Sequence, residues 1–415
     1  MTESNPAEAG NMREPQLPRR DWILLPMLSL LTTVLLILGT ELIARLEFSD
    51  SATGLAPCLI LNDISTGVRG VPNSECWAKA TESSWTEYKF NSCGHRAGME
   101  CGPKDPGSYR VVMTGSSMAM GLYVAREKSI AGRLPWELSR LTGRKIELYN
   151  ASIGAAYGGT PHSVALRFNE VLAAKPDMIL WLLTTWDLDH VSDLRPQEEY
   201  LRAVGRSTSA HSVSASFQTS ALGRAAAKVG AESIADLLYE QLKAFRFRVL
   251  LTHYLFMSQS LYVKSYLKNE DDAVGFLKAD WGPDWRERIN EFDGYAANIE
   301  EQSKAAGIPL VVVLVPNRAQ AAMISMGEWP EGYDPYKIDN ELRAVIMSHG
   351  GIYVDIFPAF RTIPNPENLY LPVDGHPDAE GHAMISGLLA KVLTSGVVPD
   401  LRAATQQQAA LEKTK

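Results

Sequence analysis

Cysteine is scarce in this sequence of 415 residues and is missing from most of it. The four cysteines all lie before residue 102: Cys58, Cys76, Cys93 and Cys101. They are too few to build a disulfide scaffold, and they do not form the two close CxxC pairs typical of structural zinc. Long runs of Lys and Arg are also missing, and 48 acidic against 40 basic residues give a net charge of −8. Nucleic acid is therefore not expected as the main partner.

The overall composition is that of a folded protein. Hydrophobic residues make up 46% of the chain and charged residues 21%. These values exclude a mostly disordered or fibrous protein. The length corresponds to about three domains of roughly 150 residues, although one large α/β domain can absorb much of it.

One hydrophobic run is long enough to cross a membrane. From Trp22 to Thr40 the sequence carries no charge, and as a helix it spans about 28 Å, close to the hydrocarbon thickness of a bilayer. Arginines are more frequent before this run than after it, which places the N-terminus in the cytoplasm. We expect a cytoplasmic tail over 1–21, a single-pass inner-membrane anchor over 22–44, and the remainder in the periplasm.

Two other interpretations of this run are open. A cleaved signal peptide has a shorter apolar region, of about 7–15 residues, and a small-x-small cleavage site, which GTELIARLEF does not offer. A buried core helix is seldom apolar on every side. An uncleaved anchor fits better than either.

The cysteines follow this run closely, in a segment (45–108) that is poor in regular pattern. This clustering fits disulfide formation in an oxidising compartment. Three connectivities are available to four cysteines, and the sequential one, Cys58–Cys76 with Cys93–Cys101, closes short loops where covalent links are most useful. Four free thiols are the alternative.

Strand-like and helix-like patterns alternate after this segment. Five short apolar runs are expected as strands: 109–114, 145–149, 178–183, 309–315 and 352–356. Helices are expected between and after them: 129–142 (kinked or shortened by Pro135), a helix capped by Thr160-Pro161, 284–306 and 377–393. This alternation predicts a three-layer, doubly wound parallel sheet of flavodoxin-like type over 109–398, with a tail at 399–415.

A long stretch between the third and fourth strands (191–285) interrupts this alternation. It exceeds one crossover and is expected to be an inserted helical cap, with helices at 225–247 and 249–257. Its mixture of Lys and Arg with aromatic residues is also compatible with contact to a membrane surface. We favour packing over the domain, because apolar helical stripes usually face a core.

Three short stretches follow predicted strands, at the edge where open α/β sheets bind their ligands. Gly115–Gly121 (GSSMAMG) can project a serine from a tight turn, and Asn150–Ala155 (NASIGA) can offer backbone N–H groups to a substrate oxygen. Asp374-Gly-His376 supplies an imidazole and a carboxylate. Such residues can act as nucleophile, general base and orienting acid.

Together these stretches resemble the SGNH, or GDSL-like, hydrolases, and especially membrane-anchored bacterial members, over about residues 85–395 without the insertion. The resemblance places the nucleophile at Ser117, with Ser116 where the family usually has aspartate. The aspartate and histidine fall on Asp374 and His376 in DGHPDAEGH, with D-x-H spacing in place of D-x-x-H, a variant of polysaccharide-acetylation relatives. It implies that Ser117 attacks an ester carbonyl, His376 is general base and acid, and Asp374 orients the imidazole.

The resemblance also implies an oxyanion hole. Its donors would be the Ser117 amide and the amide of Gly154 or Ala155. Trp186 stands where the family has an asparagine, and Thr184, Thr185 or Asn150 would compensate for it. Losing one such donor typically lowers turnover by about a hundred- to a thousandfold.

Other polar residues have simpler explanations. Asp187, Asp189 and His190 contain metal-ligand types, but we favour turn residues, and no metal or cofactor is predicted. His382 is expected to pack in the last helix. Arg318 either lines a cleft or belongs to a capped turn.

The sequence thus predicts a membrane-anchored, extracytoplasmic serine esterase acting on acyl esters of a small molecule or cell-envelope glycan. A glycan O-acyltransferase on the same fold and a non-catalytic binding or assembly protein with a degenerate site are the alternatives. A phosphate-binding protein using Gly115–Gly121 fits less well, because that loop has no Walker-type lysine.

Overall fold

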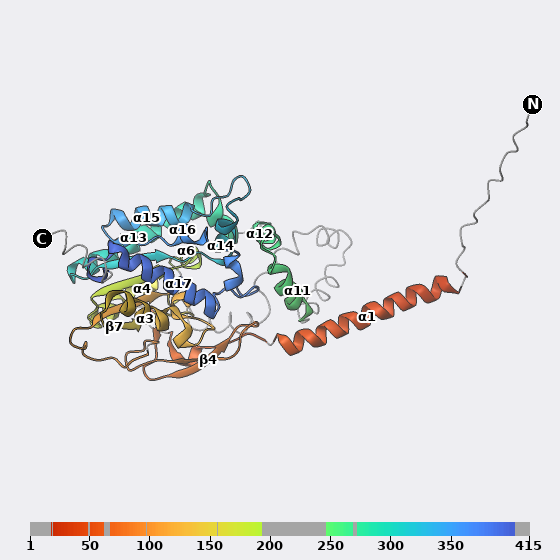
Figure 1. The fold of residues 1–415 in the computed structure, drawn as a ribbon, viewed down its shortest axis with the longest axis horizontal. Helices are drawn as coiled ribbons and strands as arrows, with labels where there is room; N and C mark the ends of the chain where they lie inside the picture. The colour runs from red at the N-terminus through yellow and green to blue at the C-terminus, as the bar shows by residue number, and fades with distance from the viewer. Residues whose placement is uncertain are drawn as a thin grey trace, which may run out of the picture.

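The computed structural model describes residues 18, 20–48, 50–61, 67–96, 98–155, 157–192, 246–268 and 272–402. A rounded body carries one long helix that projects away from it (Figure 1). Most of the expected tail at 399–415, most of the helix expected at 225–247 and most of the tail at 1–21 lie outside the described residues.

A five-stranded parallel sheet forms the centre of the body. Its spatial order is β10-β9-β8-β6-β7, which is the doubly wound topology predicted from the sequence. The strands are β6 (Tyr109–Gly115), β7 (Ile146–Asn150), β8 (Met178–Leu183), β9 (Leu310–Leu314) and β10 (Ile352–Tyr353). Every residue of β6, β7, β8 and β9 is buried, as expected when helices cover both faces.

Helices complete a three-layer sandwich, which confirms the predicted fold class. One face carries α3 (Ile130–Thr142), packed on α17 (Ala379–Val392). The other carries α13, which contacts helices from three different crossovers. The helices of this second face are α4 (Pro161–Leu166), α5 (Phe168–Ala173), α6 (Thr185–Asp189), α13 (Pro283–Ala305) and α15 (Lys337–Ser348).

Several shorter helices and 3-10 turns complete the body. They are α2 (Ser117–Met120), η2 (Arg126–Lys128), η3 (Asp272–Leu277), α14 (Arg318–Met326), α16 (Phe357–Phe360), η4 (Pro366–Leu369), η5 (Leu393–Val397) and η6 (Pro399–Leu401). Thr160 caps α4 through the Ser163 amide, as the sequence predicts. Pro135 does not shorten α3, which continues to Thr142. Arg167, by contrast, separates α4 from α5, where one helix was expected.

The cysteine-containing segment is more regular than its sequence pattern indicates. It forms a three-stranded antiparallel sheet in the order β1-β4-β5 and a two-stranded one, β2-β3. Their bounds are β1 (Ala52–Gly54), η1 (Ala56–Cys58), β2 (Leu59–Ile60), β3 (Arg69–Gly70), β4 (Glu75–Lys79) and β5 (Thr86–Lys89). The predicted sequential disulfides are confirmed: Cys58 bonds Cys76, and Cys93 bonds Cys101. We call residues 50–102 the disulfide module.

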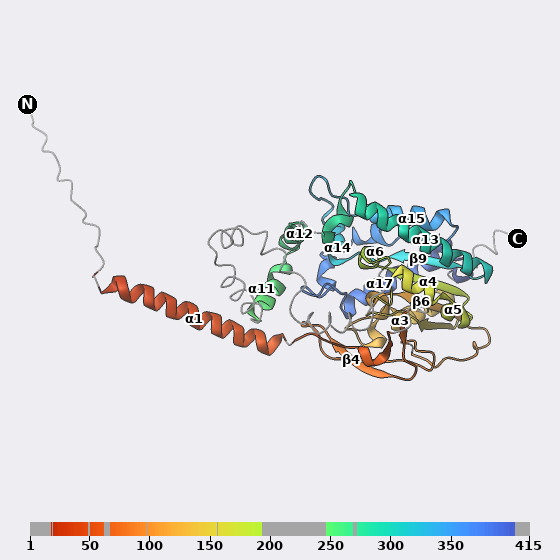
Figure 2. The same cartoon turned by 180° about the vertical axis from the view of Figure 1, so that it is seen from behind.

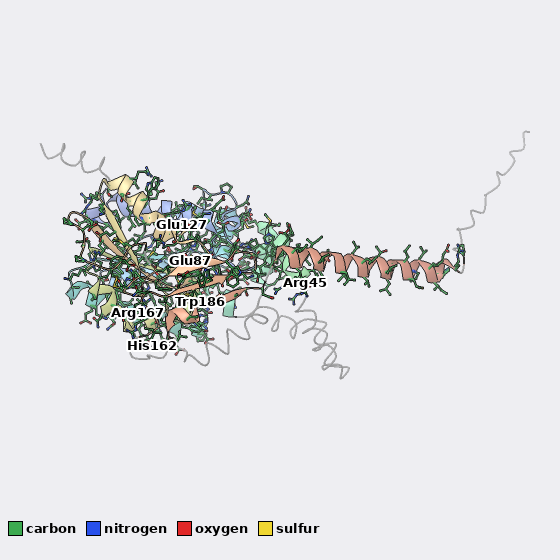
Figure 3. The ribbon with its side chains drawn as sticks, turned by 90° about the horizontal axis from the view of Figure 1, so that it is seen from below. Arg45, Glu87, Glu127, His162, Arg167 and Trp186 are labelled. Atoms are coloured by element: carbon green, nitrogen blue, oxygen red, sulfur yellow. A yellow bond between two sulfur atoms is a disulfide. The ribbon has the colours of Figure 1, made fainter. Side chains whose placement is uncertain are left out.

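Helix α1 (Asp21–Glu47) is 27 residues long and qualifies by length and hydropathy as a membrane span. Its 18-residue apolar window has a mean hydropathy of 2.3 and no buried residue. Figure 3 shows its side chains standing clear of the body, with Arg45 at the end nearest to it. The predicted apolar helix therefore exists and is not a core helix of the described structure.

The part of the insertion that the structure describes forms two helices, α11 (Phe247–Phe256) and α12 (Gln259–Leu267). Helix α11 contacts the C-terminal end of α1, and α12 lies between α11 and the body (Figures 1 and 2). The helix expected at 249–257 is present as α11, and it reaches the main core through Phe256, although none of its residues is fully buried. Helix α12 is anchored more deeply in the core, through the buried side chains of Tyr262 and Val263. An apolar pattern alone could not reveal that the outer side of α11 stays uncovered.

We expect the two disulfides to stabilise the module unequally. The loop between Cys58 and Cys76 spans 18 positions and that between Cys93 and Cys101 spans 8. Chain-entropy arguments give about 3.2 and 2.5 kcal/mol respectively. Paired Cys→Ala variants, compared by urea unfolding in detergent, should lose about these free energies. A larger loss from the Cys93–Cys101 pair would contradict the loop-length argument.

Candidate active site

Ser117 lies where β6 ends and the chain turns sharply into α2. The turn requires Gly115, which has a φ of 147° and no space for a side chain. A Cβ at this position would lie 2.2 Å from the carbonyl oxygen of Leu182 on the neighbouring strand. Ser117 is therefore the first residue of a helix that begins at the carboxyl edge of the sheet.

His376 and Asp374 come from a tight loop before α17. The loop is closed by the Leu371 amide, which donates to the His376 carbonyl at 2.8 Å, and Gly375 adopts a left-handed φ of 89° between the two side chains. His376 Nε2 lies 2.7 Å from Ser117 Oγ. On the other side of the ring, Nδ1 lies 2.6 Å from Asp374 Oδ1. The structure thus brings Ser117, His376 and Asp374 into one hydrogen-bonded chain.

Asp374 and His376 shift each other's pKa in opposite directions, and both shifts favour an ionised Asp374 beside a protonated His376. Partial burial raises the pKa of Asp374, but the attraction and hydrogen bonds of His376 outweigh it, so the pKa lies below its usual value. Burial lowers the pKa of His376, yet Asp374 more than compensates, and the pKa lies above that of free histidine. Asp374 is therefore ionised throughout the pH range in which the imidazole of His376 titrates, and it stabilises the protonated ring.

Tyr123 adds a second restraint on the imidazole. Its ring meets that of His376 edge-on, with centroids 5.5 Å apart and an interplanar angle of 90°. The backbone at Tyr123 has a φ of 63°, and its amide donates to the hydroxyl of Tyr88 at 2.7 Å. Because Tyr88 belongs to β5, the disulfide module fixes the side of the site that carries this ring.

The loop after β7 passes directly against the serine. A Cβ on Gly154 would lie 3.0 Å from the Ser117 Cα, so glycine permits this approach. The Gly154 amide points to the sulfur of Met120, at 2.9 Å. Among the described residues, no hydrogen-bond acceptor lies against the amides of Ser117 and Ala155. Of the two positions considered for the second donor, Ala155 is thus the one left open.

The side chains expected near the oxyanion have other partners. Asn150 is buried and donates to the carbonyl of Ala119 at 3.0 Å, so it holds α2 in place. Thr185 accepts from the side chain of Asn317. Trp186 is 43% exposed and forms a stack with His190 and Tyr157, with centroids 4.5 and 5.4 Å away.

Ser116, the residue before Ser117, lies near the carboxylate of Asp187 in α6. Asp187 accepts hydrogen bonds from both the amide and the hydroxyl of Thr184, in a capping box at the start of α6. Complete burial raises the pKa of Asp187 to about 7, although the nearby hydroxyl of Ser116 opposes this rise. A buried acidic group therefore lies beside the turn that carries Ser117, and it comes from the start of α6, which follows β8.

Two residues of the disulfide module support the site and were missed by the sequence analysis. Arg96 is almost fully buried and donates to the carbonyls of Met120, Gly121 and Val124, just after α2. Its guanidinium also stacks on the ring of Tyr88, 4.1 Å from the centroid. Arg96 thus ties the end of the serine helix to the module.

Glu82, at the tip of the β4–β5 hairpin, supports the histidine loop. Its Oε2 accepts the amides of Val373 and Asp374 at 2.8 and 3.1 Å. Its Oε1 pairs with Nδ1 of His253 on α11, and its side chain is 1% exposed. No local motif marks Glu82, because its partners lie far away in the sequence.

The remaining sequence candidates have structural partners. Arg318 donates to the carbonyls of Glu367, Pro372 and Phe256 and so braces the histidine loop from behind. His382 is buried, and its Nδ1 accepts the Ile130 amide, as packing predicts. In the described part of the chain, no three metal-ligating side chains come together.

Comparisons with known proteins give distant structural matches. No family model and no curated protein matches the chain. The solved structures include TesA, 11% identical with a TM-score of 0.34, covering 69% of this chain and 98% of that one. An Axe2 mutant, described as an acetyl-xylooligosaccharide esterase from Geobacillus Stearmophilus, is 12% identical with a TM-score of 0.35, covering 72% and 97%. A lipase/acylhydrolase from Enterococcus faecalis is 10% identical with a TM-score of 0.36, covering 69% and 95%.

Proposed function

We propose that this protein is a membrane-anchored, extracytoplasmic serine esterase that removes acyl groups, such as O-acetyl groups, from a cell-envelope glycan. The observation that carries the proposal is the hydrogen-bonded chain from Ser117 Oγ through His376 to Asp374. A degenerate site would not be expected to keep all three side chains in this order and at these distances.

The chain supports acyl transfer in two steps. His376 Nε2 takes the proton of the Ser117 hydroxyl as Oγ attacks the ester carbonyl, and Asp374 stabilises the resulting imidazolium. The same proton then passes to the departing alcohol as its C–O bond breaks, which leaves an acylated Ser117. A water molecule then gives a proton to His376 and attacks the acyl carbon; as the bond from the acyl carbon to Ser117 Oγ breaks, His376 returns this proton to Oγ, which releases the carboxylic acid and free Ser117.

Backbone amides would stabilise the oxyanion of each tetrahedral intermediate. The Ser117 amide is at the start of α2, and the Ala155 amide lies in the loop that Gly154 brings against Ser117. Both donors are part of the backbone, so they need no side chain at the place of Trp186.

The glycan assignment rests on the surroundings of the site. Trp186 follows β8, which pairs with β6, so its exposed ring stands at the same sheet edge as Ser117. An exposed aromatic stack is a flat apolar surface on which the ring face of a sugar can pack. Helix α1 and the two disulfides fit a domain held outside the membrane, where envelope polymers are assembled.

Replacing the nucleophile or the base should remove the activity. We expect Ser117→Ala and His376→Ala to lower hydrolysis of a chromogenic acetate ester by roughly 10⁴-fold or more, because each removes a group the chemistry requires. A fluorophosphonate should label the wild type at Ser117 and neither variant. Ser386→Ala, at a buried serine of α17, is the matched control. Equal rates and equal labelling in all proteins would refute the assignment.

The rate should rise with pH, because only the neutral imidazole accepts the serine proton. Since Asp374 raises the pKa of His376, the acidic limb of kcat/KM should have a midpoint above about 6.5. Asp374→Asn removes this attraction, so the limb should move to lower pH while the maximal rate falls by about 10²- to 10⁴-fold. A limb that stays in place would show that Asp374 does not act on the imidazole.

Glu82 should behave as a positioning residue. Glu82→Ala leaves the amides of Val373 and Asp374 without an acceptor, and we expect kcat to fall by about tenfold. The acidic limb should also move toward that of free histidine, as the Asp374–His376 hydrogen bond loosens. Glu82→Gln retains one carbonyl oxygen and should recover most of the rate.

Glu147→Gln is the control for this series, since it changes a buried carboxylate that pairs with Arg110 in the sheet. It should lower the free energy of unfolding without moving the limb. The same limb position in Glu82→Ala and wild type would reduce Glu82 to a purely structural residue.

A further inference from the structure

Helices α11 and α12 have apolar side chains on two opposite sides. On the inner side, Phe256, Tyr262, Val263, Tyr266 and Leu267 pack on the main core. On the outer side, Leu251, Tyr254 and Leu255 form one stripe of α11, and they are 54, 64 and 45% exposed. Met257 and Leu261 extend this stripe and are each about half exposed. A surface helix of a soluble domain normally turns polar residues outward, so this outer face calls for a second apolar partner.

The charged residues within α11 and α12 themselves have one sign. From residue 246 to residue 268 the sequence contains Arg246, Arg248, Lys264 and Lys268 and no Asp or Glu, although the chain as a whole is acidic. Lys264 and Lys268 follow Leu261 at helical spacing on the exposed side of α12. Arg246 is paired with Asp50. Apolar and aromatic residues bordered by lysines are typical of a helix that lies in a membrane interface.

Helix α11 begins next to the point in α1 at which the apolar run ends. The uncharged run of α1 ends before Glu41, whose Oε2 accepts the amide of Phe247, the first residue of α11, at 3.0 Å. Further along, the ring of His253 lies 5.1 Å from that of Phe48. Helix α11 is therefore held beside residues 41–48, the part of α1 that emerges from the bilayer if α1 spans it (Figure 2).

We propose that the outer face of α11 and α12, formed by Leu251, Tyr254, Leu255, Met257 and Leu261, docks on the surface of the bilayer that α1 crosses. This inference rests on the membrane anchor of the proposed function. Insertion of these side chains continues the apolar surface of α1, and Lys264 and Lys268 meet the phosphates of anionic lipids. Because Glu82 joins His253 of α11 to the amide of Asp374, docking also sets the active site close to the membrane surface.

The test uses the full chain in nanodiscs of phosphatidylcholine and phosphatidylglycerol that contain a diazirine phospholipid. After illumination, lipid adducts are mapped by mass spectrometry. We expect adducts on peptides from α1 and on peptides covering 247–261. Peptides with Trp136 on α3 and Met347 on α15, which are 63 and 60% exposed, should carry none and serve as internal controls.

The variant Leu251→Asp/Leu255→Asp should lower labelling of the 247–261 peptides several-fold and leave that of α1 unchanged. The matched variant Trp136→Asp/Met347→Asp also replaces two exposed apolar side chains, and it should change neither. Nanodiscs of phosphatidylcholine alone should give weaker labelling of 247–261, because the lysines then lack anionic partners. Circular dichroism checks that both variants remain folded.

Two results would overturn the proposal in different ways. Labelled α1 with unlabelled 247–261 would refute docking and leave the anchor intact, whereas unlabelled α1 would refute the anchor as well. If a second copy covers this face instead, chemical cross-linking will join 247–261 peptides of two chains, and lipid adducts will be missing there. Ester hydrolysis and fluorophosphonate labelling of the same samples test the proposed chemistry separately.

Discussion

The hydrogen bond between Ser117 and His376 depends on almost every layer of the protein, since it joins side chains 259 positions apart. The serine is placed by the end of β6 and the histidine by the loop before α17, and α17 returns to the sheet by packing on α3. Neither element could hold its residue alone. A parallel sheet solves the problem because all its carboxyl ends meet at one edge, so loops far apart in the chain share a single crevice.

The disulfide module takes part in this arrangement and is more than a connection to α1. Arg96 holds the end of the serine helix through three carbonyl groups, and Glu82 holds the histidine loop through two amides. The module therefore grips both partners of the Ser117–His376 hydrogen bond. Such contacts between charged side chains and backbone groups are strong in a buried setting, because no water competes for them.

The sequence predicted well what local pattern controls. Continuous apolar runs such as 178–183 identify strands covered on both faces, and short loops indicate the cysteine pairs. Ser117 was indicated by a motif that follows a predicted strand, and Asp374 and His376 by a motif just before the last predicted helix, together with the resemblance to the SGNH hydrolases. The roles assigned to them stay predictions until activity is measured.

What the sequence could not predict depends on contacts between distant segments. Nothing near Asn150 shows that its amide is taken up by α2, or that the Gly154 amide meets the sulfur of Met120. Glu82 and Arg96 look like ordinary charged residues of a loop-rich segment. In β5 the charged residues of TEYK alternate with Thr and Tyr, and this sequence pattern was a usable signal for one strand of the hairpin that carries Glu82.

The position of Arg96 links the geometry of the site to disulfide formation. This arginine lies inside the small ring closed by Cys93 and Cys101, and Glu82 lies on the stretch of chain between the two bridges. Because the two bridges restrict the segments that carry Arg96 and Glu82, we expect both side chains to be held less firmly while the thiols are still reduced. In the proposed extracytoplasmic esterase, the hydrogen-bonded chain of Ser117, His376 and Asp374 would then be completed only after export to an oxidising compartment, which keeps the protein a poor catalyst before export.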